Sequence, residues 1–261
     1  MESFGEQSYS ETKKEILDHS RKMTELSEKE TVDTKAWGIY DSPLLNEYPN
    51  YPTDIDPSYE NTFEPLFVEE GRYDYGRLKG FIEETLSSKR GKALGVDFGG
   101  PGRRVFAEFS PGLFAKTAGI VLTDFRPDSA PPPPNHSLIL GDIFAKDTQK
   151  KVLEWSNGQP IDLFFERLEG GLTSVPLDPR FMINAISWWY KNLSEGGLVF
   201  AQLPTSRRGM SDESKSLLYN WVDFIMANYQ GLIMVKIKGE AMMLHKMKGA
   251  PNFLPLLPER G

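Results

Sequence analysis

The stretch ALGVDFGGPGRRVF, residues 93–106, decides the fold of this chain. Ala93 to Val96 form a short apolar run, and the chain then passes through Asp97 into a loop. The loop contains three glycines, Gly99, Gly100 and Gly102. A buried parallel strand that runs straight into a glycine loop is how open α/β sheets bring backbone close to a nucleotide-like ligand. A tight reversal of the chain would use the same glycines, so the loop alone leaves both interpretations open.

Further strand-like runs follow, and each closes in an acidic residue. They are GIVLTD, which ends at Asp124, HSLILGD, which ends at Asp142, and IDLFFE, which ends at Glu166. Short runs of β-branched, Leu or Phe residues that close in this way predict strands sharing one sheet edge. Ligands of open α/β sheets bind outside the carboxyl ends of the strands, so this edge is the expected functional site. The alternative for Asp124 and Asp142 is a solvated strand end.

The composition limits the classes of function. The chain has 261 residues, of which 39% are hydrophobic, enough for one sizeable α/β domain with an appendage. A formal net charge of -7 gives no electrostatic footprint for nucleic acid, so a nucleic-acid partner is not expected. No apolar run approaches about 18 residues, and we expect no membrane span. The polar N-terminus is unlike a secretory signal, which predicts a soluble, cytoplasmic protein.

Cysteine and histidine usage argues against a metal site. The chain has no cysteine, so disulfides, thiolate nucleophiles and cysteine ligands are excluded. Its three histidines, His19, His136 and His245, are far apart and lack HxH or HxxxH spacing. We therefore expect no metal.

Residues 1–75 differ from the rest of the chain. They begin with a predicted helix that has the capping-box pattern Ser8-x-x-Glu11 and a thin apolar stripe. This helix is a lid, a contact for a protein partner, or a solvated arm. Between Trp37 and Tyr75, prolines interrupt any long helix while aromatic residues accumulate, which predicts an ordered, irregular cover over the main domain.

Residues 76–261 form the predicted main domain, in which strands and helices alternate. Strands are predicted at 93–97, 119–123, 137–140, 161–165 and 198–203. Helices are predicted in 75–88, through 105–109, 152–155 and 217–229, and from Pro179 through Leu193 to a stop at Gly196 and Gly197. The last run, LIMVKIKGEAMMLHKM, predicts a hairpin that turns at 238–240, one strand of which must be antiparallel.

Five strand-helix units and a final hairpin, with a glycine loop after the first strand and an acid after the second, resemble the class I S-adenosylmethionine-dependent methyltransferases. The resemblance covers about residues 76–248 in order and spacing. It implies an α/β fold: a three-layer, Rossmann-like sandwich whose seven-stranded, mostly parallel sheet takes one antiparallel strand from the C-terminal hairpin. A dinucleotide-binding Rossmann domain would continue with another parallel unit instead.

The resemblance implies S-adenosyl-L-methionine as cofactor. Residue by residue, it assigns to the cofactor Asp97, Gly99, Gly100, Gly102, Asp124, Phe125, Asp142 and Ile143. Asp124 would accept hydrogen bonds from both ribose hydroxyls, Asp142 would meet the adenine amino group, and Phe125 or Ile143 would cover the ring. Glu166 and Arg167 would face the substrate. Glu166 is the one candidate base, and its alternative role is a salt bridge to Arg167 or a lysine.

Two residues depart from the family's glycine pattern. Pro101, which has no amide donor, and Arg103, which adds bulk, stand where glycine is usual. Either the loop shifts its register onto Gly100 and Gly102, or the pocket is partly closed. An arginine at a helix start is unfavourable with the helix dipole, so we expect a compensating partner. The candidates are Asp97, Glu108 and a ligand carboxylate.

The predicted function is a methyltransferase acting on an unidentified small-molecule or protein acceptor. The first alternative is a non-catalytic, methyltransferase-like protein that binds a partner through its N-terminal segment, an alternative favoured by Pro101 and Arg103. The second is a NAD-dependent oxidoreductase, which the terminal hairpin and the lack of a Tyr-x-x-x-Lys pair oppose. Fold alone does not decide among them.

Overall fold

A computed structural model describes residues 62–67, 77–98, 100–121, 132–141, 146–166, 179–203, 205 and 211–254. The strands are β1 (Ala93–Phe98), β2 (Phe114–Val121), β3 (His136–Leu140), β4 (Ile161–Glu166), β5 (Leu193–Gln202), β6 (Ile233–Lys238) and β7 (Ala241–Lys246). The helices are α4 (Arg77–Thr85), α5 (Arg103–Ala107), α6 (Lys146–Trp155), α7 (Pro179–Lys191) and α8 (Asp212–Asn228), with short 3-10 helices η2 (Glu64–Leu66) and η3 (Ser87–Lys89).

The seven strands form one sheet in the order β3-β2-β1-β4-β5-β7-β6. Pairs among β1 to β5 are parallel, and β7 is antiparallel to both of its neighbours, β5 and β6. The hairpin therefore supplies a single antiparallel strand and returns β6 to the direction of the others. The predicted fold class, a mostly parallel α/β sandwich with a C-terminal hairpin beside strand five, is confirmed.

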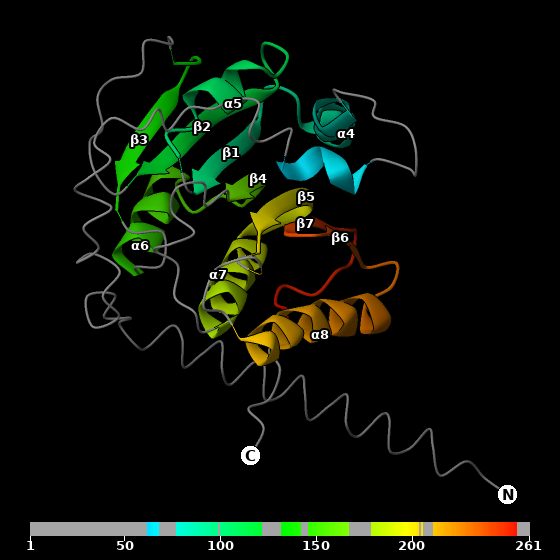
Figure 1. Cartoon of the computed structure of the whole chain (residues 1–261). Coiled ribbons are helices and arrows are strands. Elements are labelled where there is room, and N and C mark those ends of the chain that lie inside the picture. The colour runs from blue at the N-terminus through cyan, green and yellow to red at the C-terminus, as the bar shows by residue number, and fades with distance from the viewer. Residues whose placement is uncertain are drawn as a thin grey trace, which may run out of the picture.

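Helices cover both faces of the sheet (Figure 1). One core lies between the sheet and α6, α7 and α8, with Trp189 and Trp221 fully buried in it. The other lies between the sheet and α4, α5 and η2, where Phe63 and Phe106 are buried. Alternate residues of the central strands enter opposite cores, and β1 and β4 are accordingly buried along their whole length. None of the helices in the described ranges is long and apolar enough to cross a membrane.

The predicted end of α7 is wrong. Gly196 and Gly197 do not stop α7, which ends at Lys191, and Leu193 is a strand residue opposite Ile161. The next pair in the ladder joins Leu163 to Leu198, so β5 bulges by several residues here. Gly196 has a φ of +75°, which the bulge requires and which other residues rarely adopt. The strand predicted at 119–123 also begins earlier, at Phe114.

Of the N-terminal region, the structure describes residues 62–67, and these pack on the main domain. Phe63 is fully buried, and its ring centroid lies 6.0 Å from that of Phe165 on β4. Glu64 is also buried, and its Oε1 accepts a hydrogen bond from the Leu78 amide in the first turn of α4, at 3.0 Å. The carboxylate thus satisfies a free amide at a helix start. The predicted helix after Ser8 lies outside the described residues.

Candidate functional site

Buried polar side chains gather at the carboxyl ends of the central strands. Asp97 near the end of β1 and Glu166 at the end of β4 are both 0% exposed. Asp97 pairs with Phe165, the neighbour of Glu166, so the register brings the two carboxyl-bearing residues to one edge. Burying a carboxyl costs free energy unless hydrogen bonds or charges compensate it. This edge is the one at which the sequence predicts a ligand.

The glycine loop after β1 lies across β2. Gly102 has a φ of +70° and is the N-cap of α5, and a Cβ built on it would lie 3.2 Å from the Asp97 Cβ. A Cβ built on Gly119 of β2 would lie 2.0 Å from the carbonyl oxygen of Pro101. Gly102 is thus required by its conformation and Gly119 by the close backbone approach.

His136 binds the glycine loop at Pro101. Its Nε2 lies 2.8 Å from the Pro101 carbonyl oxygen, and its Nδ1 lies 2.8 Å from Thr117 Oγ1. A carbonyl oxygen only accepts, so Nε2 carries the proton, and in the neutral ring Nδ1 accepts from the Thr117 hydroxyl. Burial lowers the pKa of His136, the hydrogen bond to Pro101 opposes that shift, and the Arg103 charge adds to it. From the sequence pattern, this histidine stood out only as a possible metal ligand.

Arg103 stands directly after the glycine loop. It is the first residue of α5 and is half-buried, and its Nε is buried without a hydrogen-bond partner among the described residues. Neither Asp97 nor Glu108, the predicted protein partners, pairs with this atom. The expected compensation of Arg103 by Asp97, Glu108 or a ligand carboxylate stays a prediction.

Glu166 is held by the neighbouring strand β5, the end of which is itself bound to the hairpin turn. Its Oε2 accepts a hydrogen bond from the Gln202 amide at 3.0 Å. The Gln202 side chain donates from Nε2 to Glu240 Oε2 at 3.1 Å, and the Leu203 amide donates to the Glu240 carbonyl at 2.7 Å. Gln202 Oε1 is buried and has no hydrogen-bond partner in the described part of the chain. An acceptor of this kind suits an N–H or O–H donor of a ligand.

Sequence reasoning missed Gln202 and Glu240. The predicted hairpin could have pointed to them. Because β7 runs antiparallel to β5, the turn before β7 lies at the carboxyl edge of the parallel strands. The register pairs Gln202 with Ala241, so Glu240 lies opposite the end of β5.

Several predicted site residues lie outside the described residues. They are Gly99, Asp124, Phe125, Asp142, Ile143 and Arg167. The strands that precede them are described: β2 pairs with β3 up to Val121 and Leu140. The roles assigned to these residues stay predictions.

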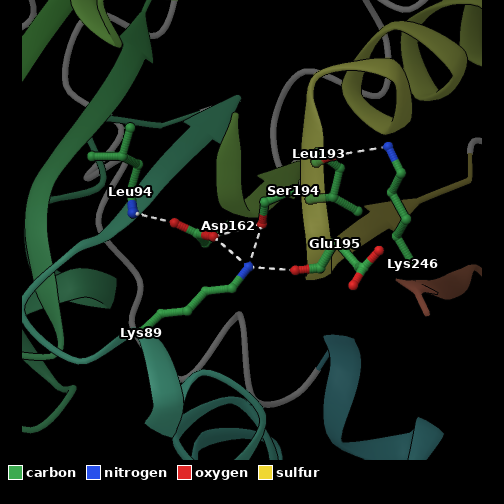
Figure 2. A network of polar contacts seen from close by, with 7 residues as sticks. All are labelled: Lys89, Leu94, Asp162, Leu193, Ser194, Glu195 and Lys246. Atoms are coloured by element: carbon green, nitrogen blue, oxygen red, sulfur yellow. Dashed lines mark hydrogen bonds and ion pairs between the residues drawn. The ribbon is translucent and has the colours of Figure 1, made fainter. Parts of the chain in front are cut away.

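A second polar cluster lies at the opposite, amino edge of the sheet (Figure 2). Lys89 Nζ donates to Asp162 Oδ1 at 2.8 Å, to Ser194 Oγ at 2.6 Å and to the Glu195 carbonyl at 2.5 Å. Asp162 also accepts from Ser194 Oγ at 2.5 Å and from the Leu94 amide at 2.8 Å. The cluster joins η3, β1 and β4 to the bulge of β5, and we assign it to the stability of the fold.

Lys246 extends the amino edge toward α7. Its Nζ donates to the Leu193 carbonyl at 2.9 Å and lies 3.4 Å from the carbonyl of Tyr190, near the end of the helix. Burial lowers the pKa of Lys246, and the nearby Glu195 charge opposes that shift. A cation at the carbonyl end of a helix is favourable with the helix dipole.

Strand order and the single antiparallel strand define a mostly parallel, Rossmann-like α/β fold, the fold that the resemblance to the class I methyltransferases implies. No protein-family model matches the chain, and no curated protein matches it in sequence. Among solved structures, it is similar to the MycE methyltransferase of the mycinamycin biosynthetic pathway, in complex with Mg and SAH. The two are 13% identical with a TM-score of 0.47, over 79% of this chain and 58% of that chain.

Two smaller proteins are also similar in structure. The N-methyltransferase NodS from Bradyrhizobium japonicum is 13% identical, with a TM-score of 0.37 over 66% of this chain and 96% of its own. An rRNA methylase from Streptococcus thermophilus is 15% identical, with a TM-score of 0.38 over 64% of this chain and 95% of its own. The chain thus spans less than two thirds of the MycE chain and nearly the full length of the other two. At these identities the likeness concerns the fold.

Proposed function

We propose that this chain binds S-adenosyl-L-methionine at the carboxyl edge of its sheet and transfers the methyl group to an acceptor. The observation that carries the proposal is the strand order, in which β7 alone runs antiparallel between β5 and β6. An ordinary dinucleotide-binding domain continues with parallel units at this position, so the hairpin argues against a nicotinamide cofactor.

The residues of the edge fit such a cofactor. Asp97 is buried beside Gly102, the left-handed residue at which α5 begins. We assign the methionine part to the segment from Asp97 to Gly102. We assign the ribose hydroxyls to Asp124 and the adenine to Asp142, with Phe125 or Ile143 over the ring. The support is positional: Asp124 and Asp142 follow shortly after the paired ends of β2 and β3.

Glu166 is the proposed base. When bound, the cofactor supplies an electrophilic methyl group on a sulfonium, and the transfer leaves S-adenosylhomocysteine. Positioning of the acceptor lone pair in line with that methyl provides most of the catalysis. If the acceptor nitrogen or oxygen carries a proton, Glu166 accepts it, since its Oε2 is oriented by the Gln202 amide. Gln202 Oε1 would accept a hydrogen bond from the same acceptor, with Arg167 facing the substrate beside it.

A non-catalytic binding protein is the second candidate. It is favoured by Pro101, which offers no amide to a ligand, and by the half-buried guanidinium of Arg103 beside the loop. Such a protein would keep the fold and fail to bind the cofactor.

Calorimetric titration with S-adenosylmethionine, S-adenosylhomocysteine and NAD separates these candidates. The proposal predicts one-to-one binding of the first two and none of NAD. Binding of NAD alone would indicate an oxidoreductase, and binding of none would favour the non-catalytic protein.

The Asp124→Ala variant tests the ribose site. We expect it to weaken cofactor binding by about 1.5–3 kcal/mol, the scale of a lost hydrogen bond to a charged group. Asp147→Ala, at an exposed residue in the first turn of α6, is the matched control and leaves the affinity unchanged. Wild-type affinity in Asp124→Ala would move the ribose site elsewhere.

A further inference from the structure

We propose that His136 is a positioning residue that fixes the glycine loop of the cofactor site through the carbonyl of Pro101. The inference rests on the proposed function, because it assigns the loop to the cofactor. Pro101 is one of the two residues that depart from the family's glycine pattern.

The loop can lie on β2 because Gly119 leaves room for it. A Cβ at Gly119 would approach the Pro101 carbonyl oxygen to 2.0 Å and its carbonyl carbon to 2.1 Å. Both atoms belong to the backbone, which cannot rotate aside as a side chain can. The loop is thus in backbone contact with the sheet at Pro101, where it has lost an amide donor and kept a carbonyl acceptor.

His136 supplies the donor that this carbonyl needs. The imidazole spans the 2.8 Å contact to Pro101 and the 2.8 Å contact to Thr117, so one ring joins the loop to two strands, β2 and β3. Thr117 is opposite His136 in the register and is 2% exposed, so its hydroxyl is fixed in place. A ring held at both nitrogens has one orientation. It presents its Nε2 proton to the loop before any ligand arrives.

The consequence is a preformed binding loop. The ring of Pro101 restricts the backbone, and the hydrogen bond from His136 holds its carbonyl against β2. Ligands bind more tightly to a loop already ordered in its bound conformation, because less entropy is lost on binding. His136 acts through Pro101 and Gly102 and touches no reacting atom in this assignment, so it is not a catalytic residue.

The test compares three variants of the full chain, with S-adenosylhomocysteine as the titrated probe. His136→Leu removes both hydrogen bonds, and His136→Gln restores a donor at the reach of Nε2. His245→Leu is the matched control: His245 is the other histidine on a described strand, half-buried on β7, and its Nδ1 has no partner among the described residues. The free energy of unfolding is measured for each variant alongside the dissociation constant.

We expect His136→Leu to raise the dissociation constant about threefold to tenfold, the equivalent of one net hydrogen bond. His136→Gln should recover most of that loss, and His245→Leu should bind as the wild type does. A role of His136 in stability alone would lower the free energy of unfolding of His136→Leu and leave the affinity of the folded variant unchanged. Affinity of His136→Leu within twofold of the wild type would overturn the proposal. If His136→Leu does not fold, Thr117→Val, which removes one hydroxyl, decides by the same criterion.

Failure of the proposed function gives a different result. If the wild type binds neither S-adenosylmethionine nor its product, the cofactor assignment is wrong, and amide hydrogen exchange over residues 102–107 then tests the anchor alone. Faster exchange there in His136→Leu, and not in His245→Leu, supports the anchor. Equal rates in all three proteins overturn it.

Discussion

The two edges of the sheet use buried carboxylates in different ways. At the amino edge, Asp162 accepts hydrogen bonds from Lys89, Ser194 and the Leu94 amide. At the carboxyl edge, Glu166 accepts from the Gln202 amide, and the Gln202 side chain keeps an unfilled acceptor among the described residues. The donors of the first cluster come from η3, β1 and β5, which are parts of the fold itself.

The difference separates stability from function. A buried carboxylate whose donors come from several elements of the protein holds those elements together. Buried polar atoms that lack a partner cost stability, and such atoms are expected where a ligand completes the hydrogen bonds. We therefore expect substitutions at the amino edge to change the free energy of unfolding, and substitutions at the carboxyl edge to change binding.

The largest expected effect is that of Asp162→Ala at the amino edge. It removes the acceptor of the Leu94 amide and the ion-pair partner of Lys89. The Lys89 ammonium keeps Ser194 Oγ and the Glu195 carbonyl as acceptors, and its side chain is 25% exposed, so these acceptors and water compensate part of the loss. We expect a loss of about 2–4 kcal/mol in the free energy of unfolding, measured by urea denaturation. Affinity for S-adenosylhomocysteine in the folded protein should not change. Glu154→Gln, on an exposed ion pair of α6, is the control with unchanged stability.

Gly119→Ala tests the contact between the loop and the sheet. The added methyl group meets the backbone of Pro101, so the loop must move. We expect a loss of about 1–3 kcal/mol in stability, the usual scale for overpacking, together with weaker cofactor binding. Gly80→Ala, on the exposed side of α4 with nothing within 4 Å of the new Cβ, should be neutral or stabilising. Unchanged binding by Gly119→Ala would place the cofactor away from this loop.

The smallest expected effect is a dependence of stability on pH. Burial lowers the pKa of His136 and of His245 below the ordinary value of 6.5, with Arg103 and Lys89 adding to the respective shifts. The unfolded chain then binds more protons than the folded one just below pH 6.5. The contribution of both groups to stability is therefore complete above pH 6.5 and is lost as the pH falls through their folded pKa values.

Thermal denaturation at pH 7.5 and 5.5 measures this dependence. The double variant His136→Gln, His245→Gln should lose less stability between the two pH values than the wild type does. If both proteins lost the same stability between the two pH values, the pH dependence would come from carboxylates and not from these histidines.

Local patterns predicted the strands of the sheet well. A short apolar run that forms a buried strand, and the turn of a hairpin, are both visible in a few consecutive residues. These patterns failed at Gly196 and Gly197, because glycines are typical of a helix end. Here the two glycines lie in the bulge of β5, where the Glu195 carbonyl accepts a hydrogen bond from Lys89. The patterns also failed at His136, whose partners Pro101 and Thr117 come from other elements. Contacts between elements depend on strand order and register, and the sequence pattern does not specify them residue by residue.

Amide hydrogen exchange with and without S-adenosylhomocysteine tests the separation of the two edges most directly. We predict slower exchange with the ligand over 97–107 and in the residues after β2, β3 and β4. We predict no change over 87–95 and 193–196, which surround Asp162 at the amino edge. Two results would contradict the assignment of the carboxyl edge to the cofactor. One is slower exchange at the amino edge when the ligand is added, and the other is the same exchange rates with and without saturating ligand at every residue.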